Sequence, residues 1–153
     1  MPRLQLKVPP AIQLVIAAGL MWGLAELTPD LGLDRGLRTW LYRGLTVLGG
    51  LVVVRGWWDF RRARTTVDPT RPHKASSLVV TGAYRFSRNP MYLGFLLLLI
   101  GWAAFLDNAY SLAALPLIVL SLTQLQIRPE EDALQSRFGS DWEDYARRVR
   151  RWI

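Results

Sequence analysis

Two short polar clusters carry the side chains that could do chemistry, and each lies beside a long apolar stretch. The first cluster runs from Thr81 to Tyr92 and reads TGAYRFSRNPMY. Its Asn89-Pro90 pair predicts the start of a helix, because Asn is a preferred N-cap and Pro is favoured at the first helical position. The positive end of that helix would lie beside Arg88, where a carboxylate or phosphate is stabilised. A plain helix start explains the pair equally well.

The second cluster is Arg128-Pro129-Glu130-Glu131. Two adjacent carboxylates near a membrane boundary are costly to keep without a partner, so they could hold a cation or the hydroxyl groups of a ribose. The alternative is again a helix start, since Pro and acidic residues both favour a first turn. Arg88 and Arg128 could position an anionic substrate, or they could contact lipid headgroups.

The two clusters together suggest a site for a small charged nucleoside. Tyrosine faces can receive an aromatic ring or a cation, and the carboxylates and arginines can pair with opposite charges. S-adenosylmethionine is a zwitterionic nucleoside that such a pocket would suit. The chain has no Cys and a single His, His73, so we expect no metal site built from thiolates or several histidines. His73 lies in a basic loop and is expected to be solvated, with a lid over the cofactor as the functional alternative.

Four apolar blocks must position these clusters, and they predict an all-α integral membrane protein. The blocks cover residues 9–27, 38–60, 91–106 and 109–127. The first two are about long enough to cross a bilayer. A signal peptide is the alternative for the first block, but no small-residue cleavage site follows it. The third has 16 residues, and Pro116 would kink the fourth. A turn signal separates the two, so they predict a short antiparallel helical hairpin.

The charged residues predict how the chain sits in the membrane. The net charge is +7, which could indicate nucleic-acid binding or basic loops at a membrane, and the long apolar blocks favour the membrane. Basic residues concentrate in the loop 61–90 and in the tail after residue 127. The positive-inside rule therefore puts both termini and the loop 61–90 in the cytoplasm, in a prokaryotic inner membrane. Residues 1–153 are then one membrane domain with about four transmembrane helices.

Two further features of the sequence concern packing and the membrane surface. Gly44, Gly49 and Gly50 would let another helix approach the second apolar block closely, which also permits a dimer. In the tail, Trp142 and Tyr145 begin an apolar face that recurs at helical spacing. Arginines occupy the other face, so residues 140–152 predict a basic amphipathic helix lying on an anionic membrane surface.

The order of the motifs over roughly residues 75–150 resembles a known family. The chain is similar to the isoprenylcysteine carboxyl methyltransferase and phospholipid methyltransferase group of integral membrane methyltransferases. The resemblance rests on Gly82-Ala83-Tyr84, Arg88-Asn89-Pro90-Met91-Tyr92-Leu93-Gly94, Glu130-Glu131-Asp132-Ala133-Leu134, Phe138-Gly139 and Tyr145.

The resemblance implies an S-adenosylmethionine site in the C-terminal half. By match, the residues that would bind the cofactor are Leu78 and Val79 through their backbones, Tyr84, Asn89, Pro90 and Tyr92 as lining, and Glu130 and Glu131 through their carboxylates. The implied reaction is in-line methyl transfer to a lipophilic acceptor, a carboxylate or an amine, driven by proximity. Asn89 stands where the family often has His, and Asn cannot become a cation, so a general base is not expected there.

Two other functions remain possible from the residues. A membrane reductase using a nicotinamide cofactor would exploit the basic loop 61–90 for the cofactor's phosphates. A membrane scaffold without enzymatic activity would use the basic tail. The acceptor itself is not encoded, because its pocket would be lined by generic apolar side chains.

Overall fold

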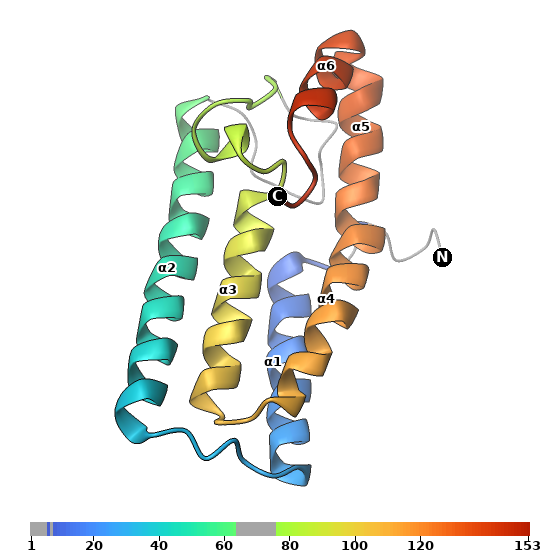
Figure 1. Ribbon diagram of the computed structural model, residues 1–153. Coiled ribbons are helices and arrows are strands. Elements are labelled where there is room, and N and C mark those ends of the chain that lie inside the picture. Colours follow the sequence, from blue (N-terminus) through green and yellow to red (C-terminus); the bar gives the residue numbers. More distant parts are fainter. Residues whose placement is uncertain (1–5, 7, 64–75) are drawn as a thin grey trace.

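The computed structural model describes residues 6, 8–63 and 76–153, and over these residues it contains helices and no strands. His73 and the middle of the expected loop 61–90 lie outside the described residues. The helices, in chain order, are α1 (Pro10–Leu27), α2 (Arg35–Arg62), η2 (Gly82–Arg85), α3 (Pro90–Phe105), η3 (Tyr110–Ala113), α4 (Ala114–Leu122), η4 (Thr123–Ile127), α5 (Arg128–Phe138) and α6 (Ser140–Arg148). Figure 1 shows α1 to α4 aligned along one axis, with η2, α6 and the C-terminus gathered at one end.

Three helical stretches are long and apolar enough to cross a membrane: Pro10–Leu27, Arg35–Arg62 and Tyr110–Phe138. The all-helical membrane fold expected from the sequence is therefore confirmed. The remaining apolar helix, α3, has 16 residues, about 24 Å at the usual rise per residue, which is shorter than a typical hydrocarbon core. A count of four spans stays a prediction.

The helix that carries the last apolar block does not end near residue 127, because it continues through η4 into α5. Pro129 has no N–H, so the α-helical bond to the carbonyl of Leu125 cannot form. That carbonyl instead accepts a hydrogen bond from the backbone N–H of Leu6 at 2.9 Å. The π-helical turn Thr123–Ile127 comes just before the proline. The second polar cluster therefore lies within a continuing helix rather than at a helix start.

Glycines hold α2 and α3 close together along much of their length. A Cβ added at Gly49 would lie 2.8 Å from the carbonyl oxygen of Gly94, and one at Gly94 would lie 2.6 Å from Val53 Cγ2. Gly49 thus allows the close approach predicted from the sequence. A Cβ added at Gly44 or Gly50 would have nothing within 4 Å among the described residues, so these two glycines take no part in the contact between α2 and α3.

Gly49→Ala is expected to destabilise the protein relative to Gly50→Ala. Both changes gain helix propensity, about 1 kcal/mol each, but only the methyl group at residue 49 meets another backbone. Overpacking of this kind typically costs about 1–3 kcal/mol, so Gly49→Ala should have the lower unfolding midpoint in detergent. Equal midpoints for the two variants would show that α2 and α3 are not in such close contact.

The turn between α3 and η3 lies at the end of the bundle away from η2 and α6. It is the tight turn that the sequence predicts at Asp107-Asn108. Asp107 has φ 54°, a left-handed conformation that Asp tolerates. Its carbonyl accepts from the N–H of Leu31 at 2.7 Å, and its carboxylate accepts from the N–H of Leu33 at 3.1 Å. Asn108 Nδ2 donates to Thr28 Oγ1 at 2.8 Å. The turn therefore holds the loop between α1 and α2 in place.

The C-terminal helix does not lie on a membrane through its apolar face, and it ends at Arg148 rather than near residue 152. Trp142 is 6% exposed and Tyr145 is 3% exposed, so these side chains pack against the protein. Trp152, beyond the helix end, packs against the hydrophobic core. The expectation was wrong because helical spacing marks an apolar face without saying whether lipid or protein covers it.

Candidate functional site

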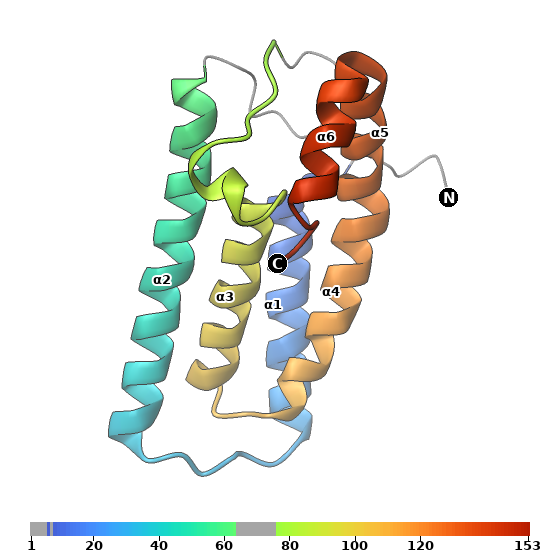
Figure 2. The same cartoon turned by 45° about the horizontal axis from the view of Figure 1, so that its top comes forward.

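The fold brings the two polar clusters into direct contact at one end of the bundle. Tyr92, in the first turn of α3, donates its hydroxyl hydrogen to Glu130 Oε1 at 2.6 Å. Arg88, just before α3, forms an ion pair with Glu131 at 3.0 Å. Figure 2 turns this end toward the viewer and shows the start of α3 beneath η2, α6 and the C-terminal segment. The juxtaposition expected from topology is therefore present in the structure.

Glu131 is shared between two arginines. Arg88 Nη1 lies 3.0 Å from Glu131 Oε1, and Arg151 donates from Nε at 3.1 Å and from Nη2 at 2.5 Å. The side chains of Arg88 and Glu131 are 14% and 13% exposed. Two cations against one carboxylate leave an excess positive charge. Arg88 Nε is buried and has no hydrogen-bond partner among the described residues, so a donor is left for an additional acceptor.

The C-terminal segment closes over the start of α3. The backbone N–H of Arg88 donates to the carbonyl of Arg150 at 3.0 Å. Asn89 Nδ2 donates to the carbonyl of Arg151 at 2.9 Å. Asn89 is the N-cap residue of α3, as the sequence predicted, but its side chain makes no capping hydrogen bond. Its amide instead ties together segments separated by 62 residues.

Asp59 supports the Gly-x-Tyr motif, and sequence reasoning missed it. The carboxylate is 6% exposed, accepts from the N–H of Ala83 at 2.8 Å and pairs with Arg55 at 3.3 Å. Gly82 has φ 63°, and a Cβ there would lie 2.2 Å from Asp59 Oδ2. Glycine is required at this position for both reasons. The sequence offered one signal for Asp59, which is a single carboxylate close to the Arg-rich end of α2.

Two buried tyrosines join η2 to α6. Tyr145 donates its hydroxyl hydrogen to the carbonyl of Tyr84 at 2.8 Å, and the Tyr84 ring meets the Phe60 ring edge-on at 5.2 Å. Burial raises the pKa of the Tyr84 hydroxyl, and the neighbouring Tyr145, Glu130 and Asp59 raise it further. Burial likewise raises the pKa of Tyr145. Both hydroxyls are therefore protonated at neutral pH and do not act as bases.

Of the other residues predicted from the sequence, Pro90, Val79 and Leu78 lie on or just before η2 and α3, whereas Arg128 lies apart. Pro90 is buried at the first helical position of α3. Val79 is buried and Leu78 half-buried in the segment that leads into η2. Arg128 is exposed and donates to Gln124 Oε1 at 3.0 Å along its own helix. Among the described residues, no hydrogen bond or ion pair joins Arg128 to the other predicted site residues, so its expected role with the acceptor gains no support from its position.

Comparisons with known proteins point in the same direction as the geometry. Residues 37–141 match the family model for phospholipid methyltransferase. Over 111 residues, 68% of the chain, it is 32% identical to a protein-S-isoprenylcysteine O-methyltransferase of Saccharomyces cerevisiae, covering 46% of that protein. It is 36% identical over 72 residues, 47% of the chain, to a probable protein-S-isoprenylcysteine O-methyltransferase of Oryza sativa subsp. indica, covering 38% of it.

A small bacterial protein matches over its whole length. An uncharacterized protein of Haemophilus influenzae is 38% identical over 63 residues, which are 41% of the chain and 100% of that protein. The matches span less than half the length of the yeast and rice methyltransferases. No solved structure matches the chain significantly.

Proposed function

Because the chain belongs to the phospholipid methyltransferase family, we propose that it is an integral membrane methyltransferase that uses S-adenosylmethionine and methylates a lipophilic acceptor. The observation that carries the proposal is the pairing of Tyr92 with Glu130 and of Arg88 with Glu131. These contacts join the two motifs that resemble the family into one polar cluster. The three apolar stretches of membrane-crossing length fit an acceptor that resides in the bilayer.

The residues present fit this cofactor. S-adenosylmethionine carries an amino group, a sulfonium, a carboxylate and ribose hydroxyls. Glu130 would hold the amino group or the hydroxyls, and the unpartnered Arg88 Nε would donate to an anionic or carbonyl oxygen. Tyr84 and Tyr92 would offer ring faces to the adenine or to the sulfonium. Leu78 and Val79 would contribute backbone groups from the segment before η2.

The proposed reaction needs little acid–base catalysis from the protein. The sulfonium supplies an activated methyl group, so holding it in line with the acceptor provides much of the rate. Asn89 cannot become a cation, and the raised pKa values of Tyr84 and Tyr145 keep those hydroxyls protonated. A carboxylate acceptor is ionised at neutral pH and needs no base, so this arrangement suits a carboxylate better than an ammonium.

The acceptor is proposed to enter sideways from the bilayer. The name of the yeast relative points to a prenylated cysteine carboxylate, whereas the family name points to phospholipids. Both are amphiphiles with a reactive group at headgroup level, and the chemistry above favours the carboxylate. The distribution of Lys and Arg supports a cytoplasmic position for the site in a prokaryotic inner membrane.

Glu130→Gln is expected to weaken S-adenosylmethionine binding by roughly 10-fold to 100-fold, the size of a lost charge-assisted hydrogen bond. The glutamine can still accept the hydrogen bond from Tyr92, so the local fold should persist. Calorimetry on detergent-purified protein measures the change. The matched control is Asp132→Asn, which removes an exposed carboxylate from the same helix and should leave binding unchanged.

The outcome separates the proposal from its alternatives. Unchanged binding by Glu130→Gln would contradict the role of Glu130 in cofactor binding, but it would not contradict the proposal of a methyltransferase. Absence of S-adenosylmethionine binding by folded wild-type protein would contradict the proposed function. Binding of a nicotinamide cofactor in that case would favour a reductase, and binding of neither cofactor would favour a scaffold.

A further inference from the structure

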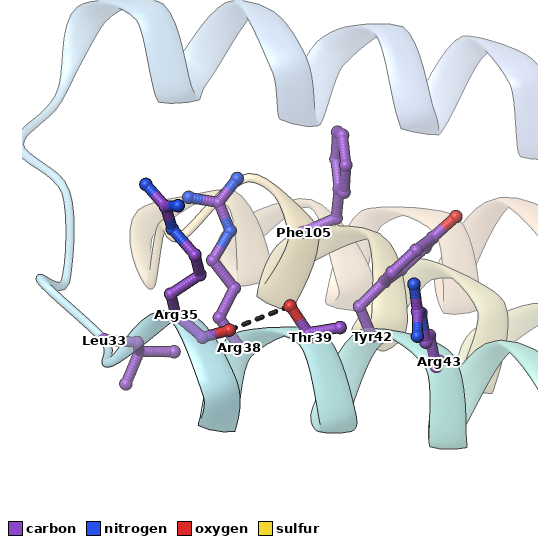
Figure 3. A pocket seen from close by; sticks show the side chains of 7 residues that line it. All are labelled: Leu33, Arg35, Arg38, Thr39, Tyr42, Arg43 and Phe105. Carbon is purple, nitrogen blue, oxygen red and sulfur yellow. Dashed lines mark hydrogen bonds between the residues drawn. The ribbon is translucent and has the colours of Figure 1, made fainter.

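A pocket lies at the end of the bundle opposite the candidate site. It has a volume of ≈ 490 Å³ and is formed by the first turns of α2, the last turn of α3 and the loop that precedes α2. Figure 3 shows Arg35 and Arg38 extending from α2 into this pocket, with Tyr42 and Phe105 beside them. The pocket is separated from the Tyr92–Glu130 contact by most of α3, about 20 Å at the usual helical rise.

Three arginines line this pocket: Arg35, Arg38 and Arg43. Among the described residues, no ion pair to these arginines is present, although two carboxylates lie close in sequence or space. Asp34 accepts from the N–H groups of Gly36 and Leu37, and Asp107 accepts from the N–H of Leu33. Both carboxylates are therefore already engaged by the backbone, and the arginines retain positive charge for a ligand.

Aromatic rings hold one of these arginines in place without neutralising it. The Arg38 guanidinium lies 5.7 Å from the centre of the Phe105 ring. Phe105 in turn stacks on Trp102 at 5.0 Å and contacts Tyr42 at 5.1 Å. A cation over an aromatic face keeps its donors free, and guanidinium groups match the oxygens of a phosphate. The pocket is thus prepared for a phosphate-like anion.

The surroundings of the pocket indicate that the anion belongs to a lipid. Only 6% of the apolar window of α2 is buried, so in a membrane most of this helix faces acyl chains. Trp40 is 77% exposed and Leu37 50% exposed, and both lie within the first turns of α2. An exposed Trp is typical of the headgroup level. A phosphate in the pocket would therefore have apolar surface beside it for attached chains.

We propose that this pocket binds the phosphate of an anionic phospholipid in the leaflet at this end of the bundle, with the acyl chains lying along α2. The bound lipid is a structural partner, because the pocket is too far from the proposed methyl-transfer site for it to be the acceptor. The Asp107-Asn108 turn prepares the pocket by holding the loop before α2. The proposal does not depend on S-adenosylmethionine chemistry.

The test is native mass spectrometry of the full chain in detergent, titrated separately with phosphatidylglycerol, phosphatidylcholine and inorganic phosphate. We expect at least tenfold tighter retention of phosphatidylglycerol than of phosphatidylcholine. Inorganic phosphate should not displace the lipid at equal concentration. The double variant Arg38→Gln, Arg43→Gln should lose the preference for phosphatidylglycerol. Arg62→Gln removes the same charge from the exposed far end of α2 and should retain it.

Each arm can overturn the proposal. Equal retention of the two lipids by wild-type protein would show that the headgroup charge is not recognised. Displacement of the lipid by inorganic phosphate would assign the pocket to a free anion. If Arg62→Gln lost the preference for phosphatidylglycerol to the same extent, the lipid would be held by general attraction to basic residues rather than by the pocket. The wild-type comparison of lipids stands by itself if the double variant does not fold, which circular dichroism and size-exclusion chromatography establish beforehand.

Discussion

Glu131→Ala is expected to lower the free energy of unfolding by about 3–5 kcal/mol, the cost of removing one partner from a buried ion pair. The change strips the carboxylate from two guanidinium groups at once, and Arg88, whose side chain is 14% exposed, has no other ion pair among the described residues. The C-terminal segment would lose one of its anchors, because Arg151 reaches Glu131 from that segment. Unfolding in a denaturing detergent, followed by tryptophan fluorescence, measures the loss.

A control and a second variant separate charge from general disruption. Glu143→Ala removes an exposed carboxylate that accepts a hydrogen bond from Gln135 at 2.7 Å, and it should cost under about 1 kcal/mol. Combining Glu131→Ala with Arg88→Met removes both buried partners and should recover part of the stability. If Glu131→Ala unfolded at the same denaturant concentration as Glu143→Ala, the result would contradict a stabilising role for the buried ion pairs of Glu131.

Gly82→Ala is expected to weaken both stability and cofactor binding, more than the same change at a second glycine with positive φ. Gly82 has φ 63° and Gly139 has φ 51°, so alanine strains the backbone at both positions. Only at residue 82 would the new Cβ meet a carboxylate, at 2.2 Å from Asp59 Oδ2, whereas Gly139 has nothing within 4 Å. The contact should add about 1–3 kcal/mol.

Paired measurements on Gly82→Ala and Gly139→Ala therefore isolate the contact with Asp59. We expect a lower unfolding midpoint for Gly82→Ala and, because Tyr84 follows two residues later, a reduced affinity for S-adenosylmethionine by calorimetry. Gly139→Ala should keep the affinity. Identical losses in the two variants would show that backbone strain alone matters and that Asp59 does not support the motif.

The parts of the structure that the sequence predicts are those set by local chemistry. Apolar block length gave the helices, Asp107-Asn108 gave the turn, and Asn89-Pro90 gave the start of α3. The positive-inside rule also predicts that the two polar clusters lie at one end of the bundle, and in the structure Tyr92 donates a hydrogen bond to Glu130 there. Each of these rests on residues next to one another in the chain or on a rule that acts on whole segments.

The parts that the sequence did not predict depend on distant partners. Nothing in the spacing of Trp142 and Tyr145 says that protein rather than lipid covers them. Asp59 is 24 residues from the N–H that it accepts, and no local pattern links the two. Helical spacing places Arg151 on the basic face expected at an anionic membrane surface, yet its guanidinium pairs with Glu131 across 20 residues. Arg128 was expected at the site, but its helical position turns it to Gln124.

The division of the site between two distant segments has a consequence for biosynthesis. Tyr145 lies 61 residues after the carbonyl that it binds, so a ribosome needs roughly 3–12 s to pass from one to the other at typical rates of synthesis. During that interval the start of α3 is without its C-terminal partners. Asp59 precedes both, so it can hold the N–H of Ala83 as soon as that residue emerges. The nascent chain therefore has a template for η2 before the residues that complete the site have been made.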